Sequence, residues 1–181
     1  MGIFNHSRLI DTKKQKISNW VSLVEKKVLT NSGDEEFYHS IDQDDYVTVM
    51  GLTKDNKVPL VKQFRPAINC ISLELPGGLL DDKGETPESA ARRELYEETG
   101  YKSLSKMINL GCLNPDSGRL ENKLWCFFLP NVEFDETWSK ESGIDPIVLD
   151  VNSLKQLILK NEFNQALHIA IIGLASLKGL I

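Results

Sequence analysis

The chain has 181 residues, of which 41% are hydrophobic and 26% are charged, and its formal net charge is −5 at pH 7. This length and apolar content suffice for one well-packed core, so we expect a single domain over residues 1–181, with an N-terminal strand region at 1–45 and a core at 46–181. The negative charge argues against nucleic acid as the partner, because phosphate backbones are bound by basic surfaces.

Strands separated by turn residues are expected in the N-terminal half. The segments 20–30 and 37–40 have strand composition, and the Asn31–Asp34 sequence between them is typical of a turn, which predicts an N-terminal β-hairpin. The further strands expected are 46–53 and 58–64, joined as a second hairpin, then 72–75, 107–113, 123–129 and 147–149.

A central helix is marked at both ends. Thr86 is a suitable N-cap, Pro87 follows at the first helical position, and Gly100 can adopt the left-handed conformation that ends a helix. The helix is therefore predicted to run from Pro87 to Thr99. Its buried stripe is expected to consist of Ala91, Leu95 and Thr99.

Two further helices are expected near the C-terminus, after the polar segment 135–145. Asn152 is predicted to cap the first helix and Asn164 the second. The apolar stretch 166–177 is too short to span a membrane and is predicted to be a core helix. Strands on both sides of a central helix, closed by two C-terminal helices, predict an α+β fold, an α/β sandwich with a mixed sheet.

The three cysteines are Cys70, Cys112 and Cys126. They are odd in number and widely spaced, which favours buried free thiols over a disulfide framework. Free thiols in turn predict a reducing, cytoplasmic location.

Three glutamates are predicted to lie on one turn of the central helix. Glu94 neighbours both Glu97 and Glu98, and like charges at this spacing repel each other by a few tenths of a kcal/mol. A hard cation such as Mg²⁺ relieves the repulsion, because it prefers carboxylate oxygens and shares them with substrate phosphates. Arg93 is placed to pair with Glu97. A solvated charged helix face is the alternative interpretation of such a string.

The region around these glutamates resembles the Nudix box. The spacing from Glu85 to Gly100 matches the pattern, with Arg-Glu-aliphatic-x-Glu-Glu-x-Gly at its end. The loop between Gly78 and Glu85 is one residue longer than the pattern, and Tyr101 replaces its final aliphatic residue. The resemblance implies a Nudix fold, with a mixed β-sheet between helices, and a divalent-metal-dependent hydrolase. Asp81 and Asp82 are expected to shape the loop.

The resemblance also implies roles for individual residues. The metal ligands for Mg²⁺ or Mn²⁺ would be Glu94, Glu97, Glu98 and the carbonyl oxygen of Gly77. Arg93 and Glu85 would support the catalytic carboxylates. The general base would be Glu141, on the loop before the C-terminal helices, with Glu136 as the alternative and a solvated acidic loop as the competing interpretation.

Two flanking motifs narrow the resemblance to the branch of ADP-ribose pyrophosphatases and nucleoside-diphosphate-sugar hydrolases. They are Val61–Pro66 and Glu74–Asp82. In this branch an arginine matching Arg65 contacts the substrate, and an aromatic residue of the first strand, matched by Trp20, stacks on adenine, sometimes across a dimer. Arg119 would read a sugar or a terminal phosphate. The alternative for Arg65 is a strand end in solvent. For Trp20 it is ordinary packing, and for Arg119 it is an exposed turn.

The expected activity is therefore hydrolysis of a nucleoside diphosphate linked to another moiety, with ADP-ribose giving AMP and ribose 5-phosphate. Serine stands at position 117, where ADP-ribose pyrophosphatases often carry proline, so another nucleotide sugar or a dinucleotide remains an alternative. A non-catalytic nucleotide-binding module and a purely structural protein are further alternatives. The expected partners are this small molecule and a second copy in a homodimer, with no nucleic acid and no membrane.

Overall fold

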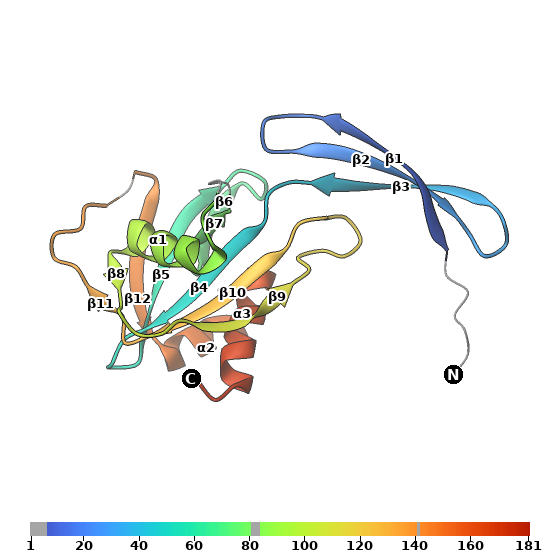
Figure 1. The fold of residues 1–181 in the computed structure, drawn as a ribbon. Coiled ribbons are helices and arrows are strands. Elements are labelled where there is room, and N and C mark those ends of the chain that lie inside the picture. The colour runs from blue at the N-terminus through green and yellow to red at the C-terminus, as the bar shows by residue number, and fades with distance from the viewer. Residues whose placement is uncertain (1–6, 81–83, 141) are drawn as a thin grey trace. The chain divides into compact units, whose positions relative to one another are not determined.

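A computed structural model describes residues 7–80, 84–140 and 142–181. The chain forms two compact units, one made of residues 1–44 and 114–123, the other of residues 45–113 and 124–181. Figure 1 labels the helices and strands of both units.

The N-terminal unit contains a three-stranded antiparallel sheet in the order β1-β2-β3. The strands are β1 (Arg8–Lys16), β2 (Ser22–Leu29) and β3 (Glu35–Asp42). The hairpin of β2 and β3 was predicted and is confirmed, with the Thr30 N–H donating to the carbonyl oxygen of Asp34 at 2.8 Å. β1 was not predicted, because it is largely polar and exposed along its whole length, so no apolar pattern reveals it.

Trp20 does not lie on a strand, which corrects the expectation from sequence. The chain bends at residues 18–20, where the Ser18 hydroxyl accepts the N–H groups of Trp20 and Val21, both at 3.2 Å. This local hydrogen bonding competes with strand pairing. The Trp20 side chain is 62% exposed.

The second unit is built on two sheets. The mixed sheet has the order β7-β4-β10-β9, with β4 and β10 parallel at its centre. The antiparallel sheet has the order β12-β5-β6, and β8 pairs with β11. The bounds are β4 (Tyr46–Leu52), β5 (Lys57–Arg65), β6 (Cys70–Glu74), β7 (Gly77–Leu79), β8 (Tyr101–Lys102), β9 (Ile108–Leu113), β10 (Leu124–Pro130), β11 (Glu133–Phe134) and β12 (Ile144–Asp150).

The second hairpin predicted from sequence is wrong. A tight turn at residues 53–57 joins β4 to β5, but the two strands belong to different sheets. β4 pairs in parallel with β10, and β5 pairs with β12. Each strand contains a short buried run, Val47–Gly51 in β4 and Val58–Val61 in β5, and such runs do not reveal which distant strand is the partner.

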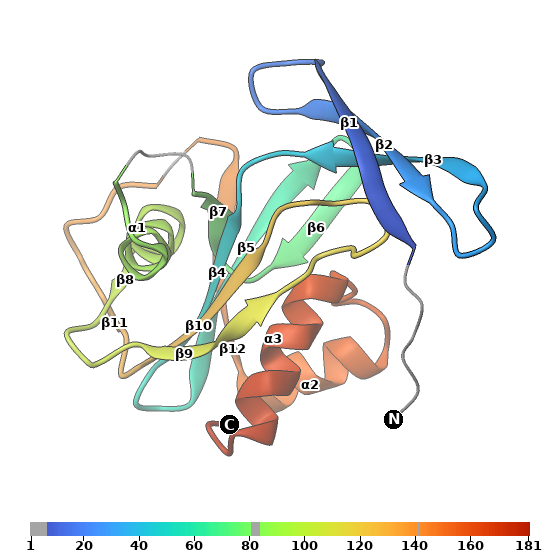
Figure 2. The same cartoon turned by 45° about the vertical axis from the view of Figure 1, so that its right-hand side comes forward.

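Helices cover both faces of the mixed sheet, as Figures 1 and 2 show: α1 (Pro87–Thr99) lies on one face and α3 (Ala166–Leu177) on the other, while α2 (Val151–Leu159) follows β12. Side chains of β10 alternate between the two cores. Phe127 packs into the α1 core with Leu95, and Phe128 packs into the α3 core with Ile171. This confirms the predicted α+β fold with a mixed sheet between helices.

The ends of the C-terminal helices differ from the prediction. Asp150, not Asn152, caps α2, since its carboxylate accepts the Ser153 N–H at 2.9 Å. Gln165, not Asn164, caps α3. No helix in the described ranges is long and apolar enough to cross a membrane.

The three cysteines are free, as predicted, but their burial differs from the prediction. Cys126 is buried, and burial raises the pKa of its thiol to about 12. Cys70 and Cys112 are exposed, because Cys70 begins β6 and Cys112 lies on the outward face of β9.

Candidate active site

The glutamate-bearing helix α1 has the predicted bounds and is fixed at both ends. The Thr86 hydroxyl accepts the Ser89 N–H at 3.2 Å, and the Ser89 hydroxyl accepts the Thr86 N–H at 3.0 Å. Gly100 has a φ of 74° and donates its N–H to the carbonyl oxygen of Tyr96 at 2.8 Å. These caps satisfy backbone groups that a helix end otherwise leaves unpaired.

Arg93 links three carboxylates of the site. Its Nε and Nη2 donate to Glu85 at 3.1–3.3 Å, and its Nη1 donates to Glu94 at 2.8 Å and to Glu97 at 2.9 Å. The hydrogen bonds to Glu85 are the main cause that raises the pKa of Arg93 far above its ordinary value. The predicted pairing of Arg93 with Glu97 is therefore present, and Glu85 and Glu94 join it.

A segment of four residues, Glu74–Gly77, crosses from β6 to β7 beside α1, and we call it the strap. Each of its residues is held by a different element. The Leu75 N–H donates to Nδ1 of His168 on α3 at 3.0 Å, and the carbonyl oxygen of Pro76 accepts from β4. His168 is buried, and burial lowers its pKa to about 4, so the neutral ring accepts this hydrogen bond.

The end of the strap contacts the carboxylates of α1. The Gly77 N–H donates to Oε2 of Glu98 at 2.9 Å, and Glu98 is only 6% exposed. A Cβ atom on Gly78 would lie 2.5 Å from Oε1 of Glu94. The absence of side chains at both glycines therefore lets the backbone approach the two carboxylates closely. The expected buried stripe of Ala91, Leu95 and Thr99 is confirmed, and Glu98 is buried as well.

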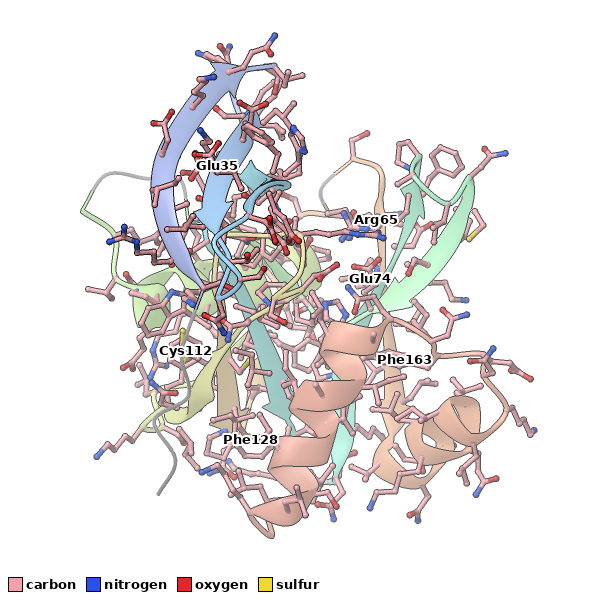
Figure 3. The ribbon with its side chains drawn as sticks, turned by 90° about the vertical axis from the view of Figure 1, so that its right-hand side faces the viewer. Glu35, Arg65, Glu74, Cys112, Phe128 and Phe163 are labelled. Atoms are coloured by element: carbon pink, nitrogen blue, oxygen red, sulfur yellow. The ribbon has the colours of Figure 1, made fainter. Side chains whose placement is uncertain are left out.

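The other end of the strap holds Arg65. Its Nε donates to Oε1 of Glu74 at 2.8 Å and its Nη2 to Oε2 at 2.5 Å, and Figure 3 shows the two side chains together. Burial by itself raises the pKa of Glu74, but hydrogen bonds from Arg65 and Ser72 outweigh burial and lower it. Glu74 is therefore an ionised carboxylate in a site where it is 2% exposed.

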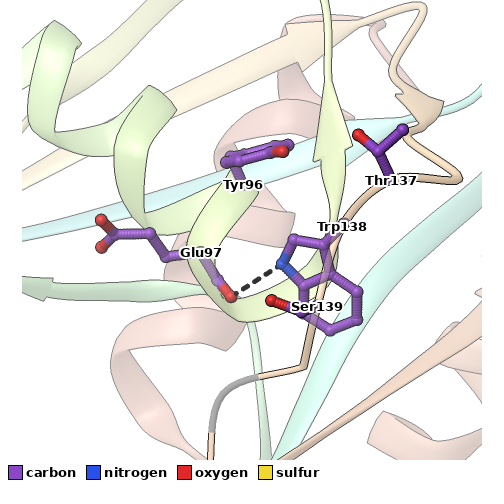
Figure 4. Close-up of a pocket in the computed structure, with 5 residues that line it drawn as sticks. All are labelled: Tyr96, Glu97, Thr137, Trp138 and Ser139. Carbon is purple, nitrogen blue, oxygen red and sulfur yellow. Dashed lines mark hydrogen bonds between the residues drawn. The ribbon is translucent and has the colours of Figure 1, made fainter.

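A pocket of about 460 Å³ lies beside the last turn of α1. The indole N–H of Trp138 donates to the carbonyl oxygen of Glu97 at 3.2 Å, as Figure 4 shows. The lining residues are Tyr96, Glu97, Thr137, Trp138 and Ser139.

The NUDIX domain model matches residues 43–167. The chain belongs to the Nudix family. It is 51% identical over 59 residues to an ADP-sugar pyrophosphatase from Mus musculus, covering 32% of this chain and 27% of that protein. It is 48% identical over 63 residues to an ADP-ribose pyrophosphatase from Bacillus subtilis (strain 168), covering 34% of each. These matches thus span about a third of the curated relatives' length.

A solved structure extends the likeness over the whole Nudix fold. The crystal structure of an ADP compounds hydrolase superposes with a TM-score of 0.82 and covers 99% of this chain and 98% of its own. Sequence identity in this comparison is 18%, so it establishes the fold.

The Nudix helix and the strap offer oxygen ligands. In the described part of the chain, no three His, Cys, Asp or Glu side chains form a metal-binding group. The carboxylates of Glu94 and Glu98 beside the strap form a smaller set of oxygen donors. Mg²⁺ is commonly bound by one or two carboxylates together with water and substrate phosphates, so these residues fit a cation that the substrate helps to hold.

The remaining predicted site residues are distributed over both units. Arg65 lies in the same unit as the α1 glutamates, whereas Trp20 and Arg119 belong to the N-terminal unit. Arg119 is exposed and lies in a turn, where its N–H donates to the carbonyl oxygen of Asp116. Glu141, Asp81 and Asp82 lie outside the described residues.

Sequence reasoning did not single out Glu74 or Trp138. One signal for Glu74 was present, because it is a charged residue between the two apolar residues Leu73 and Leu75. A carboxylate that is buried among apolar residues needs a cationic partner. No comparable pattern marks Trp138.

Proposed function

We propose that this Nudix protein hydrolyses a nucleoside diphosphate linked to another moiety, with ADP-ribose as the favoured substrate and AMP and ribose 5-phosphate as products. The observation that carries the proposal is the close approach of Gly78 to Glu94 and of Gly77 to Glu98. The names of the relatives, an ADP-sugar pyrophosphatase and an ADP-ribose pyrophosphatase, support the substrate class.

The proposed metal site uses Glu94, Glu98 and the carbonyl oxygen of Gly77, with Glu97 as a further ligand. Bound Mg²⁺ or Mn²⁺ supplies charge neutralisation on the diphosphate and lowers the pKa of a coordinated water. Arg93 orients the neighbouring carboxylates and offsets their mutual repulsion, because it hydrogen-bonds to Glu85, Glu94 and Glu97.

In the proposed reaction, the water oxygen attacks one phosphorus atom of the diphosphate. The bridging P–O bond breaks, and the leaving phosphate takes the bonding electron pair. A carboxylate general base takes the proton of the water, a role that we assign to Glu141, with Glu136 as the alternative. Arg65 donates N–H groups to diphosphate oxygens, and Trp20 and Arg119 contact the nucleoside and the second moiety.

The proposed partners are this small molecule and a second copy of the chain in a homodimer. The three free thiols support a reducing, cytoplasmic location.

A panel of nucleotide sugars and dinucleotides, assayed with Mg²⁺ and with Mn²⁺, tests the proposal. Products are separated by chromatography. We expect metal-dependent release of AMP from ADP-ribose at a higher kcat/KM than from the other compounds. Preferential turnover of another compound would correct the substrate. Thermal stabilisation by ADP-ribose without product would identify a binding module instead.

A further inference from the structure

The ion pair of Arg65 and Glu74 has the geometry of a positioning device. Two parallel hydrogen bonds join the Nε and Nη2 edge of the guanidinium to both carboxylate oxygens, at 2.8 and 2.5 Å. A bidentate pair of this kind fixes the plane of the guanidinium as well as its location.

The register of the strands shows that this arrangement is specific. Arg65 lies opposite Cys70, and Glu74 lies opposite Val61, so the arginine side chain reaches back along the sheet to meet its partner. Arg65 stands at the end of β5, where an unpartnered side chain would extend into solvent. Glu74 therefore determines where the guanidinium is held.

The pairing leaves part of the guanidinium available. Arginine carries five N–H donors, of which the two bonds to Glu74 use two. Within the described residues, no hydrogen bond involves Nη1 of Arg65, and the side chain is 44% exposed. The hydrogen bond to Glu74 raises the pKa of Arg65, and the negative charge of Glu98 adds to the effect. The guanidinium thus stands within electrostatic reach of a proposed metal ligand.

We propose that Glu74 is a positioning residue, which holds Arg65 so that its remaining N–H groups bind a diphosphate oxygen of the substrate. The inference rests on the proposed function. Glu74 acts only through Arg65 and does not contact substrate. A purely structural role would not require this pair, since replacing a buried ion pair by apolar residues of similar volume is often neutral or stabilising.

The first test compares Glu74→Gln with the wild type in steady-state hydrolysis of ADP-ribose with Mg²⁺. Loss of a hydrogen bond to a charged group lowers affinity by about 10- to 100-fold. We therefore expect kcat/KM to fall by about this factor, mainly because KM rises. The matched control is Glu133→Gln, which removes an exposed carboxylate paired with Lys54 at 2.6 Å and should leave KM unchanged. An unchanged KM in Glu74→Gln would overturn the inference.

A double-mutant cycle separates positioning from packing. Arg65→Ala leaves an uncompensated buried carboxylate, so the free energy of unfolding should fall, and adding Glu74→Gln should recover part of it. In kcat/KM, Glu74→Gln should have no further effect once Arg65 is removed. Equal losses from Glu74→Gln in both backgrounds would show that Glu74 acts independently of Arg65 and would overturn the inference.

Calorimetric titration with ADP-ribose in EDTA separates this inference from the proposed function. If the wild type binds ADP-ribose but releases no AMP with metal, the proposed hydrolysis is wrong. Weaker binding of ADP-ribose by Glu74→Gln than by the wild type would still support the positioning role of Glu74. Equal affinities would overturn positioning, and no binding by the wild type would overturn both. If Glu74→Gln does not fold, Arg65→Lys replaces it, because lysine cannot form the bidentate pair. Wild-type affinity in Arg65→Lys would overturn the inference.

Discussion

The strap and the N-terminal sheet differ in how their residues are held. Glu74, Leu75 and Gly77 of the strap are each hydrogen-bonded to a different element, and Glu98 beside it is 6% exposed. In β1, β2 and β3, Val24 is the one described residue that is buried. The fold's buried contacts thus hold the proposed chemical groups, whereas the N-terminal sheet relies on backbone pairing and on exposed or half-exposed ion pairs such as Lys13–Glu25. Substitutions should therefore have unequal effects in the two regions.

The largest expected difference is between two glycines. A Cβ atom on Gly77 would lie 2.3 Å from the carbonyl oxygen of Val47, so Gly77→Ala forces backbone to move and should lower the free energy of unfolding by about 3 kcal/mol or more. Gly33 has a φ of +90° with no atom within 4 Å of an added Cβ, so Gly33→Ala should cost only about 1 kcal/mol, from backbone strain. Urea denaturation measures both, and equal losses would contradict the comparison.

Acid should weaken the strap through His168. Burial lowers its pKa to about 4 in the folded chain, against an ordinary value of 6.5. As pH falls from 6.5 to 4, His168 takes up a proton in the unfolded state before it does so in the folded state. The free energy of unfolding should therefore fall by up to about 3 kcal/mol over that window. Glu74, whose pKa is lowered, loses its own contribution as pH falls further.

The contribution of His168 is isolated by measuring unfolding against pH in two variants. His168→Gln should flatten the slope between these pH values, while His39→Gln, which removes an exposed histidine of the N-terminal sheet, should leave it unchanged. A wild-type slope in His168→Gln would contradict the assignment.

Arg93→Lys tests whether the carboxylates depend on a shared partner. One ammonium group cannot reproduce the fork that joins Glu85, Glu94 and Glu97. We expect kcat to fall by about 10- to 100-fold, the usual effect of losing a partner that orients metal ligands, with a higher Mg²⁺ requirement. The control is Arg92→Lys on the same helix, where arginine binds the carbonyl oxygens of Ser103 and Ser105. Similar kinetics in the two variants would argue against a special role for Arg93.

The smallest effect on stability is expected at Trp20. Its side chain is 62% exposed, so Trp20→Ala should leave the melting temperature unchanged. If the indole stacks on the base, KM for ADP-ribose should rise about tenfold or more, given the energies of base stacking on aromatic rings. Phe37→Ala removes another exposed aromatic residue of the N-terminal unit as a control. An unchanged KM in Trp20→Ala would remove Trp20 from the binding site.

The sequence predicts α1 well because each boundary has a local chemical signal. Thr86, Pro87 and Gly100 specify its ends without reference to the rest of the chain. The pairing of β4 with β10 depends instead on residues far apart in sequence, so local patterns suggested a hairpin that does not exist. β1 escaped prediction because exposed polar strands lack apolar alternation.

The site was predictable to a similar degree. The glutamates of α1 carry a spaced motif, and in the structure Glu98 lies against Gly77 and Glu94 against Gly78. The roles of Glu74 and His168 arise from contacts between β5, β6 and α3, which no local pattern encodes. Local patterns thus predict the candidate carboxylates, and tertiary contacts decide what holds them.

The proposed function requires that the carboxylates of Glu94 and Glu98 support hydrolysis of a diphosphate. Glu98→Gln tests this requirement, because the amide oxygen can still accept the Gly77 N–H while the negative charge is lost. The measurement is Mg²⁺-dependent release of AMP from ADP-ribose by folded wild type and variant. We expect hydrolysis by the wild type and a variant rate at background. Full turnover by Glu98→Gln would contradict this role of the carboxylate.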